Sequence, residues 1–310
     1  MKKQITIVAP TYNEEDNVLL FYSRVNEAIK KIANYQFEFL FIDNASTDKT
    51  VRILKELAKT NKQIKIIVNT RNFGHIRSPY WGIIQSQGDA TIYLASDLQD
   101  PPELIPKFID AWEKGFKVVL GVKPESKLNF INHQLRKAYY RLLNKISDVV
   151  IIKNSTGFGL YDKEVLNEVR KINDPYPFLR GIIAELGYEV KQIPFVQDLR
   201  LKGHTKNNFY TLYDVGMLGI INHSITPIRI ASLVGFLVGC TSLIFAFIFI
   251  FLKIMYWNNF PLGISPIIIG MFFMFGLILI FIGFLGEYIG SIHTYLQKRP
   301  IVVEKERINF

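Results

Sequence analysis

Two long stretches without a charged residue, both toward the C-terminal end, constrain this chain more than any other feature. One covers the 23 residues 230–252 and the other covers the 33 residues 254–286. Because about 20 consecutive apolar residues suffice to cross a bilayer as a helix, each stretch can hold one span. We therefore predict a two-helix transmembrane hairpin in region 229–288, with helices at about 230–252 and 264–286. A buried helical pair in a soluble protein is the alternative.

The basic residues around these stretches predict the orientation of the hairpin. Arg229 precedes the first span, only Lys253 marks the connector, and four basic residues follow the second span: Lys298, Arg299, Lys305 and Arg307. Since cytoplasmic segments carry the excess of lysine and arginine, we expect the N-terminal domain and the tail 289–310 in the cytoplasm. The apolar run 5–9 is too short for the core of a signal peptide. We expect a multi-pass protein of the inner (cytoplasmic) membrane.

Charge and cysteine content narrow the partners and cofactors. The net charge of +10 suits nucleic acid or anionic lipid headgroups, and the two apolar stretches favour the lipid. Cys240, the sole cysteine, lies within the first stretch, so the sequence predicts neither a disulfide framework nor a thiolate metal cluster. It contains neither an HExxH motif nor a GxxxxGK[ST] phosphate-binding loop. We therefore expect a membrane protein that does not bind nucleic acid.

Up to about residue 121, short apolar runs alternate with helical segments. We predict five strands, at Ile5–Ala9, Phe37–Ile42, Ile64–Val68, Ala90–Leu94 and Val118–Gly121. This alternation is typical of an α/β domain with a mostly parallel sheet and helices on both faces. Ligands of such domains bind beyond the carboxyl ends of the strands. Asp43, Arg71 and Asp97 all follow such ends, so we expect the functional site there.

The stretch 94–103, LASDLQDPPE, places several polar residues directly after a predicted strand. Asp100, followed by two prolines and Glu103, is typical of a helix start, in which Asp100 caps the helix and Glu103 closes a capping box. A direct role of Asp100 in catalysis is the other interpretation. A helix cap does not explain Asp97 and Gln99, which precede it, so a ligand-binding role is expected for those two.

Ordered motifs along nearly the whole chain resemble those of one enzyme family. They are APTYNEEDN (9–17), FIDNASTDKT (41–50), RNFGH (71–75), SDLQDPPE (96–103), FLRG (178–181), RLKGHTK (200–206) and GEYIG (286–290). With the hairpin, they resemble family 2 glycosyltransferases of the polyprenyl-phosphate type, such as dolichyl-phosphate mannose synthases and bacterial undecaprenyl-phosphate glucosyltransferases. The resemblance implies a Rossmann-like GT-A catalytic domain at 1–205, an amphipathic juxtamembrane linker at 206–228, and the hairpin beyond it.

The same resemblance implies an activity. An enzyme of this type transfers a single hexose from a nucleotide-sugar, with UDP-glucose as the best guess, to polyprenyl (undecaprenyl) phosphate on the cytoplasmic membrane face. The reaction would invert the anomeric carbon and use Mg²⁺ or Mn²⁺. Its product would serve cell-envelope glycans such as lipopolysaccharide or capsule. Assembly into a homo-oligomer through the membrane helices is a further expectation.

Matching positions imply roles for individual residues. Asp97 and Gln99 match metal ligands, and their carboxylate and amide oxygens suit Mg²⁺ or Mn²⁺. The expected catalytic residues are Asp97, Asp100 and Arg200, and the expected acceptor phosphate-binding residues are Lys123 and Arg136. The expected nucleotide-sugar-binding residues are Pro10, Tyr12, Glu14, Asp43, Arg71, Ser96 and Lys206. Ordinary packing for Tyr12, helix-dipole stabilisation for Glu14 and solvated charges for the cations are the alternatives.

Three positions depart from the family pattern, and each loses an acid. Asn44 replaces the second aspartate of a DDGS motif, Ala95 the first aspartate of DADLQD, and Gly157 the acid of GDFRL. These losses keep a second hypothesis open, a non-catalytic nucleotide-sugar-binding membrane module or a scaffold in glycan assembly. A processive polysaccharide synthase fits less well, because the sequence lacks a QxxRW motif and has one predicted hairpin only.

Overall fold

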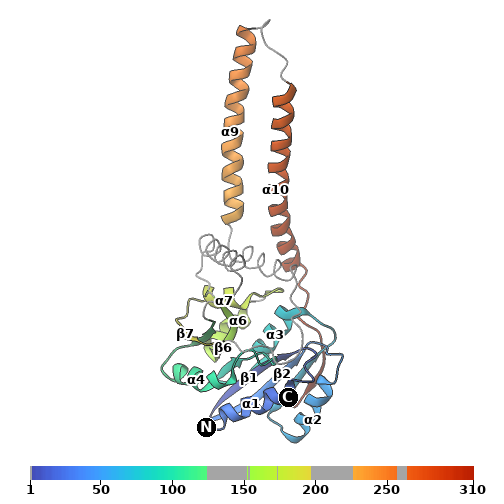
Figure 1. Ribbon diagram of the computed structural model, residues 1–310, viewed down its shortest axis with the longest axis vertical. Helices are drawn as coiled ribbons and strands as arrows, with labels where there is room; N and C mark the ends of the chain where they lie inside the picture. The colour runs from blue at the N-terminus through green and yellow to red at the C-terminus, as the bar shows by residue number, and fades with distance from the viewer. Residues whose placement is uncertain (1, 124–151, 153, 173, 197–225, 257–263) are drawn as a thin grey trace.

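The computed structural model consists of an α/β domain and a pair of long helices that rise from one end of it (Figure 1). The structure describes residues 2–123, 152, 154–172, 174–196, 226–256 and 264–310. Both ends of the chain lie in the α/β domain, so the chain leaves that domain at the first of the two long helices and returns to it after the second.

The described residues form one eight-stranded mixed sheet, in the order β7-β5-β6-β4-β1-β2-β3-β8. Its strands are β1 (Lys3–Thr11), β2 (Tyr35–Asp43), β3 (Ile64–Asn69), β4 (Ala90–Tyr93), β5 (Val118–Val122), β6 (Ser155–Asp162), β7 (Val190–Pro194) and β8 (Glu304–Ile308). β1 pairs in parallel with both β2 and β4. β6 is antiparallel to β4 and β5, and β8 is antiparallel to β3. The five predicted strands are present, but β6 and β8 make the sheet mixed.

Neither β6 nor β8 was predicted, and each lacks the pattern of a buried strand for a physical reason. In β6, Gly159 interrupts the apolar run because β5 lies very close, and an added Cβ would lie only 2.2 Å from the carbonyl oxygen of Val119. β8 has the sequence EKERI, in which exposed and half-buried residues alternate. Charged side chains of this kind are typical of edge strands, where they discourage pairing with other chains.

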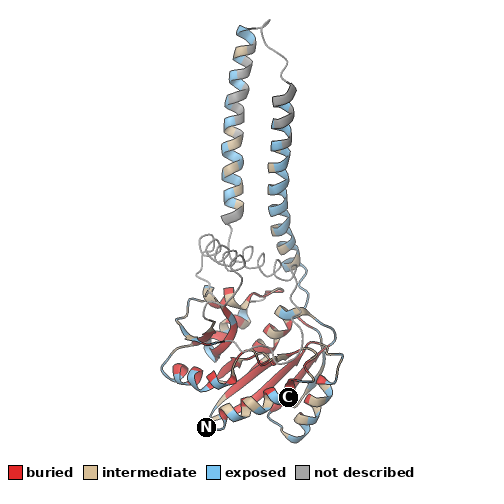
Figure 2. Ribbon diagram, in the orientation of Figure 1, coloured by how far each residue is buried: buried red, intermediate tan, exposed pale blue. Residues whose placement is uncertain are grey.

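Helices cover both faces of the sheet, as predicted (Figure 2). One face packs against α1 (Val18–Ile29), α2 (Thr50–Thr60) and α4 (Ile105–Glu113), and the other against α3 (Gly74–Gln85), α6 (Lys163–Lys171) and α7 (Leu179–Glu185). Successive side chains of a strand point to opposite faces. Phe39 and Phe41 of β2 therefore enter the first layer, while Leu40 and Ile42 enter the second. Burial on both faces explains why the central strands are nearly continuous apolar runs.

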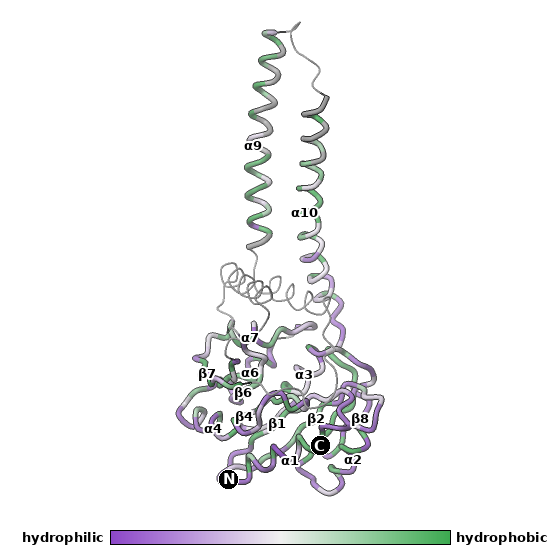
Figure 3. The backbone as a smooth tube through the Cα atoms, in the orientation of Figure 1, coloured by the Kyte–Doolittle hydropathy of each residue, from purple (hydrophilic) through white to green (hydrophobic). Residues whose placement is uncertain are grey.

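The two long helices are α9 (Thr226–Met255) and α10 (Ile264–Leu296). They lie side by side and are apolar along most of their described length (Figure 1, Figure 3). Many of their large apolar side chains are exposed. Among the described residues, the segment Phe273–Leu296 is long and apolar enough to cross a membrane, and Ile228–Val238 is a shorter apolar segment.

The chain returns to the sheet after α10. β8 pairs with β3, and Thr70, which follows β3, donates its backbone N–H to the carbonyl of Val303 at 2.9 Å. Trp81 of α3 donates its indole N–H to the carboxylate of Glu304, and Val302 is buried. The end of the C-terminal tail is therefore an integral part of the α/β domain.

Candidate functional site

Most of the described residues predicted to form the site lie at one edge of the sheet, where β1, β2 and β4 end. β1 has β2 on one side and β4 on the other, so the order of the strands reverses at β1. A reversal of this kind leaves a crevice at the carboxyl ends of the strands, which is the usual ligand site of α/β sheets. The loops that follow Thr11, Asp43 and Tyr93 form this edge.

Each of these three loops contains a non-glycine residue with a positive φ angle. These are Asn13 (54°), Ala45 (61°) and Leu98 (61°). Left-handed backbone is unfavourable for residues that carry a Cβ, at a cost on the order of 1–2 kcal/mol per residue. Burial of the Leu98 side chain holds it in this conformation. Strained backbone is common at functional sites, although Asn154, Lys298 and Asn309 also have positive φ angles elsewhere in the described chain.

Asp100 is not the helix cap that one interpretation of the sequence predicts. The helical turn that follows it and α4 have Pro101 and Leu104 at their N-cap positions, and neither has a side-chain cap hydrogen bond. Glu103 forms an ion pair with Arg24 at 2.8 Å instead of closing a capping box. Asp100 is buried, and its Oδ1 atom has no hydrogen-bond partner among the described residues. The helix-cap interpretation therefore does not account for the Asp100 carboxylate.

Burial and neighbouring charges control the protonation of Asp100. Loss of water around the carboxyl raises its pKa from 3.8 to about 6, while the positive charge of Lys123 opposes this rise and the negative charge of Asp97 adds to it. Asp97 is half-buried and accepts the backbone N–H of Gln99 at 3.2 Å. A cation held by Asp97 and Asp100 would satisfy the unpaired oxygen and reduce the repulsion between the two carboxylates.

The residues present fit a divalent ion that is shared with a substrate. Asp97, Gln99 and Asp100 offer the oxygen ligands that Mg²⁺ and Mn²⁺ prefer. In the part of the chain that the structure describes, no group of three or more His, Cys, Asp and Glu side chains could hold a metal ion. Mg²⁺ commonly uses one or two carboxylates and completes its shell with waters and substrate phosphates. The donor set therefore suits an ion that binds together with a diphosphate.

Hydrogen bonds join the loops after β1 and β2. The carboxylate of Asp43 is fully buried and accepts hydrogen bonds from the backbone N–H and the hydroxyl of Ser46, whose oxygen also accepts the N–H of Asn13 at 2.9 Å. Burial raises the pKa of Asp43, and the Ser46 hydrogen bonds partly oppose this. Glu14 is buried, and its backbone N–H donates to Thr50 Oγ1 at 2.9 Å. Asp43 and Glu14 thus organise the site edge, and their contact with a nucleotide stays a prediction.

Three further residues predicted to bind the nucleotide-sugar lie near the same strand ends, and a fourth, Arg71, follows β3. Ser96 is buried and donates its hydroxyl to the carbonyl of Pro10 at 2.7 Å, which joins the end of β1 to the loop after β4. Tyr12 is half-buried in the loop after β1. Arg71 is exposed and its guanidinium lies over the Phe73 ring, 4.0 Å from the centroid. The Ser96 hydroxyl therefore has a structural partner, whereas Arg71 can reach an anion in solution.

The three positions that lose an acid differ in their surroundings. The Asn44 amide donates to Asn72 Oδ1 at 2.9 Å and accepts the N–H of Phe73 at 2.8 Å, and an aspartate could make only the second bond. Gly157 has a φ angle of 91°, a conformation that favours glycine. Nothing in the structure explains Ala95.

The predicted phosphate-binding cations are described only in part. Lys123 follows β5, donates its backbone N–H to the carbonyl of Asn154 at 3.1 Å, and lies close enough to Asp100 to affect its pKa. Arg136, Arg200 and Lys206 lie outside the described residues, so their roles stay predictions.

Three side chains that were not assigned from the sequence interact electrostatically with one another, and one of them, Tyr93, also interacts with Asp97 and Asp100. Burial raises the pKa of Tyr93, the negative charges of Asp100 and Asp97 add to this rise, and the positive charge of Arg180 opposes it. Burial likewise raises the pKa of Tyr161, with an added effect of Tyr93 and an opposing effect of Arg180. These groups therefore lie within electrostatic reach of one another. A lone cation in the apolar segment that begins with FLRG is the signal that could have identified Arg180.

Comparisons with known proteins identify glycosyltransferases as similar to this chain. The family model for Glycosyl transferase family 2 matches residues 6–170. The chain is 33% identical over 301 residues to the uncharacterized glycosyltransferase YkcC of Bacillus subtilis (strain 168), covering 97% of this chain and 93% of YkcC. It is 31% identical over 305 residues to the bactoprenol glucosyl transferase of Shigella phage SfX, covering 98% and 99% of the two chains. A solved structure, the mannosyltransferase PcManGT from Pyrobaculum calidifontis in complex with GDP-Man and Mn²⁺, is similar with a TM-score of 0.48 and 17% identity, covering 74% of this chain and 65% of that one.

Proposed function

The chain belongs to glycosyl transferase family 2, with a GT-A-like domain, and from that premise we propose that it transfers a single hexose from a nucleotide-sugar to polyprenyl phosphate. UDP-glucose and undecaprenyl phosphate are the best candidate substrates, supported by the full-length similarity to a protein named bactoprenol glucosyl transferase. One observation carries the proposal: a buried carboxylate oxygen of Asp100 without a described partner, next to the charge of Asp97. A cation would stabilise the negative charge of such a site, and it would also stabilise the negative charge of a nucleotide diphosphate.

We assign Asp97, Gln99 and Asp100 to hold a Mg²⁺ or Mn²⁺ ion together with the donor diphosphate. When bound, the ion neutralises the negative charge that develops on the leaving diphosphate. The burial of Asp100 makes its charge more effective, because little water is present to screen it. We assign Arg71, an exposed residue in the loop after β3, to bind the phosphates of the donor.

The acceptor phosphate can attack without a protein base. A phosphate monoester has a second pKa near 6, so it is largely a dianion at neutral pH. One of its oxygens forms a bond to the anomeric carbon, the bond from that carbon to the diphosphate oxygen breaks, and the electron pair leaves with the nucleotide diphosphate. No proton is transferred, and attack from the opposite face inverts the anomeric carbon. The protein contributes positioning and charge neutralisation, with Lys123 and Arg136 as acceptor cations.

We propose that α9 and α10 cross the cytoplasmic membrane as a hairpin. The pairing of β8 with β3 supports an even number of crossings, because β8 follows α10 and β3 precedes α9. A single crossing would place these two paired strands on opposite sides of the membrane. The basic residues that flank the two helices favour the cytoplasm for the α/β domain and for both termini.

Sugar transfer by the full-length protein in detergent tests the proposal. The protein is incubated with undecaprenyl phosphate and a panel of radiolabelled nucleotide-sugars, in Mn²⁺, in Mg²⁺ or in EDTA, and lipid-extractable label is counted. We expect metal-dependent labelling from one donor, with UDP-glucose first. Asp97→Asn should lower the rate by roughly 100- to 1,000-fold, the usual effect of removing one electrostatic stabiliser. Asp110→Asn is the matched control, because Asp110 is exposed on α4 and pairs with Lys114.

The possible results separate the hypotheses. Labelling from a donor other than UDP-glucose would revise the sugar that we assign and would still support the proposed reaction. Nucleotide binding without transfer from any donor would contradict the proposal and support the non-catalytic module, since that hypothesis rests on the lost acids at Asn44, Ala95 and Gly157.

A further inference from the structure

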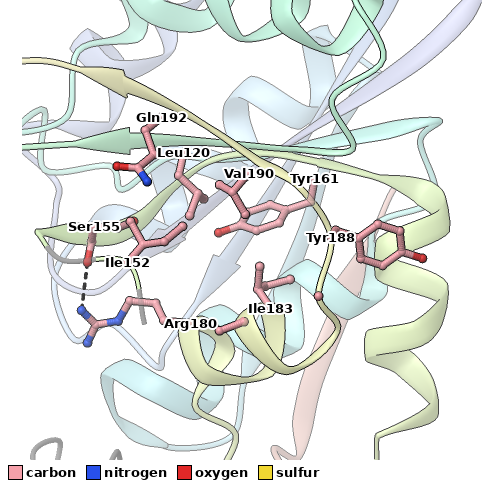
Figure 4. A pocket seen from close by; sticks show the side chains of 11 residues that line it. Leu120, Ile152, Ser155, Tyr161, Arg180, Ile183, Tyr188, Val190 and Gln192 are labelled. Carbon is pink, nitrogen blue, oxygen red and sulfur yellow. Dashed lines mark hydrogen bonds between the residues drawn. The ribbon is translucent and has the colours of Figure 1, made fainter. Parts of the chain in front are cut away.

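A pocket of about 280 Å³ lies between α7 and the end of the sheet formed by β5, β6 and β7 (Figure 4). Its walls include Leu120 of β5, Ser155 and Tyr161 of β6, Arg180 and Ile183 of α7, and Val190 of β7. One water occupies about 30 Å³ in the liquid, so the pocket has room for roughly nine waters. This space suits a small headgroup with a short apolar segment and is too small for a long polyprenyl chain.

Arg180 gives the pocket one strong preference, for an anion. Its guanidinium donates to the backbone carbonyl of Ser155 at 2.9 Å, and no carboxylate of the described chain forms an ion pair with it. A guanidinium carries five N–H donors, so several remain for a ligand. Their planar arrangement matches the oxygens of a phosphate.

The rest of the wall combines apolar side chains with the polar groups of Ser155, Tyr188 and Gln192. Leu120 and Ile183 are buried, and Ile152 and Val190 are half-buried beside them in the lining. Figure 4 shows these side chains around one space, with the Arg180 guanidinium at its margin. A phosphate with an attached hydrocarbon chain matches this combination, because its charge pairs with Arg180 and its first carbons contact the apolar wall.

Electrostatic interactions link the pocket to the candidate catalytic edge. Arg180, Asp97 and Asp100 all affect the pKa of Tyr93, so the charges of both sites act on one side chain. The backbone provides a second link between the two sites. In the sequence, the wall residues Ile152 and Ser155 lie on either side of Asn154, whose carbonyl accepts the backbone N–H of Lys123. An anion held by Arg180 is therefore within electrostatic reach of Tyr93, as are the two carboxylates to which we assign the donor diphosphate.

We propose that this pocket binds the phosphate end of the prenyl phosphate acceptor, with Arg180 as a phosphate-binding residue and the wall around Ile183 in contact with the first isoprene unit. The proposal rests on the proposed function and adds a site for one of its two substrates. α7 lies toward the end of the domain from which α9 and α10 rise, so a chain that leaves the pocket can reach them (Figure 1).

Binding of geranyl phosphate to the full-length protein in detergent tests this proposal. The compound has the same head as the longer lipids and a short chain, so little of it enters micelles. We expect Arg180→Ala to weaken binding roughly 10- to 100-fold, the loss expected for hydrogen bonds to a charged group. Ala184→Leu, which fills the pocket from α7 with a good helix former, should weaken binding about 10-fold or more. Unchanged binding in both variants, or no binding to the wild type, would overturn the proposal.

Two further ligands distinguish the sources of affinity. Inorganic phosphate and geraniol should each bind far more weakly than geranyl phosphate. Inorganic phosphate that binds as tightly would indicate a bare anion site, and geraniol that binds as tightly would remove the role of Arg180. Either result would contradict the proposal.

Arg170→Ala is the matched control for folding. Arg170 also donates to backbone carbonyls, those of Ile84 and Ser86, but it lies outside the pocket. It should bind geranyl phosphate as the wild type does. Arg180→Lys, which keeps the charge, replaces the alanine variant if that variant unfolds, and it should bind with intermediate affinity.

UDP binding and sugar transfer, measured in all variants, separate the two proposals. Arg180-dependent binding of geranyl phosphate without any sugar transfer would keep the pocket and contradict the proposed function. Sugar transfer with an acceptor KM that is unchanged in Arg180→Ala would keep the function and contradict the pocket.

Discussion

Replacing Asp100 with asparagine should stabilise the protein at neutral pH and impair its function. Burial raises the pKa of this carboxyl from 3.8 to about 6, which corresponds to about 3 kcal/mol at roughly 1.4 kcal/mol per tenfold change in proton affinity. The folded protein binds this proton more tightly than the unfolded chain does. The stability therefore falls as the pH rises from about 4 to about 6, and the full cost is present above that range.

The asparagine variant does not carry this pH-dependent cost. Its amide has a packing cost of its own, but that cost is the same at every pH and cancels in a comparison between two pH values. With pKa values of 3.8 unfolded and about 6 folded, the stability gain from Asp100→Asn should be about 2 kcal/mol larger at pH 7.5 than at pH 4.5. For a domain of this size the difference corresponds to about 4–8 °C in melting temperature.

Thermal unfolding in detergent without divalent metal, at both pH values, measures this difference. Asp110→Asn, an exposed position on α4, should change stability by less than about 0.5 kcal/mol at either pH. Adding Mn²⁺ and UDP should raise the melting temperature of the wild type and of Asp110→Asn much more than that of Asp100→Asn. A stability gain from Asp100→Asn that is equal at the two pH values would refute the assigned burial and charge of Asp100.

Two further predictions concern the parts of the fold that were not predicted from sequence. Deleting residues 301–310 removes β8, the Trp81–Glu304 hydrogen bond and the buried Val302. The free energy of unfolding, measured in urea, should therefore fall by about 3 kcal/mol. Lys305→Ala, an exposed change on the same strand, should leave it unchanged. Gly159→Ala places a carbon 2.2 Å from the carbonyl oxygen of Val119 and should lower the free energy of unfolding by about 3 kcal/mol or more. Gly276→Ala, whose added carbon meets nothing within 4 Å, should have the melting temperature of the wild type.

The sheet edge that holds the candidate site could be predicted because its signals are local. Apolar runs mark the strands of a sheet that is buried on both faces, and polar residues such as Asp43 and Asp97 mark where those strands end. β6 could not be predicted in this way, because the close approach of β5 requires a glycine at position 159 and interrupts the apolar run. The sequence allowed Asp100 to be a helix cap, and only the missing cap hydrogen bond and the burial of its side chain removed that interpretation.

By itself, the sequence determined the alternating α/β domain, the edge where its polar loops gather, and two apolar helices near the C-terminus. These features repeat over a few neighbouring residues, so periodicity and composition reveal them. The tertiary structure decided the return of the tail to β3, the unpaired carboxylate of Asp100 and the pocket at Arg180. These depend on contacts between residues far apart in the chain, as between Trp81 and Glu304, which are 223 residues apart. Burial and the charge around a buried group arise only when such distant segments pack together.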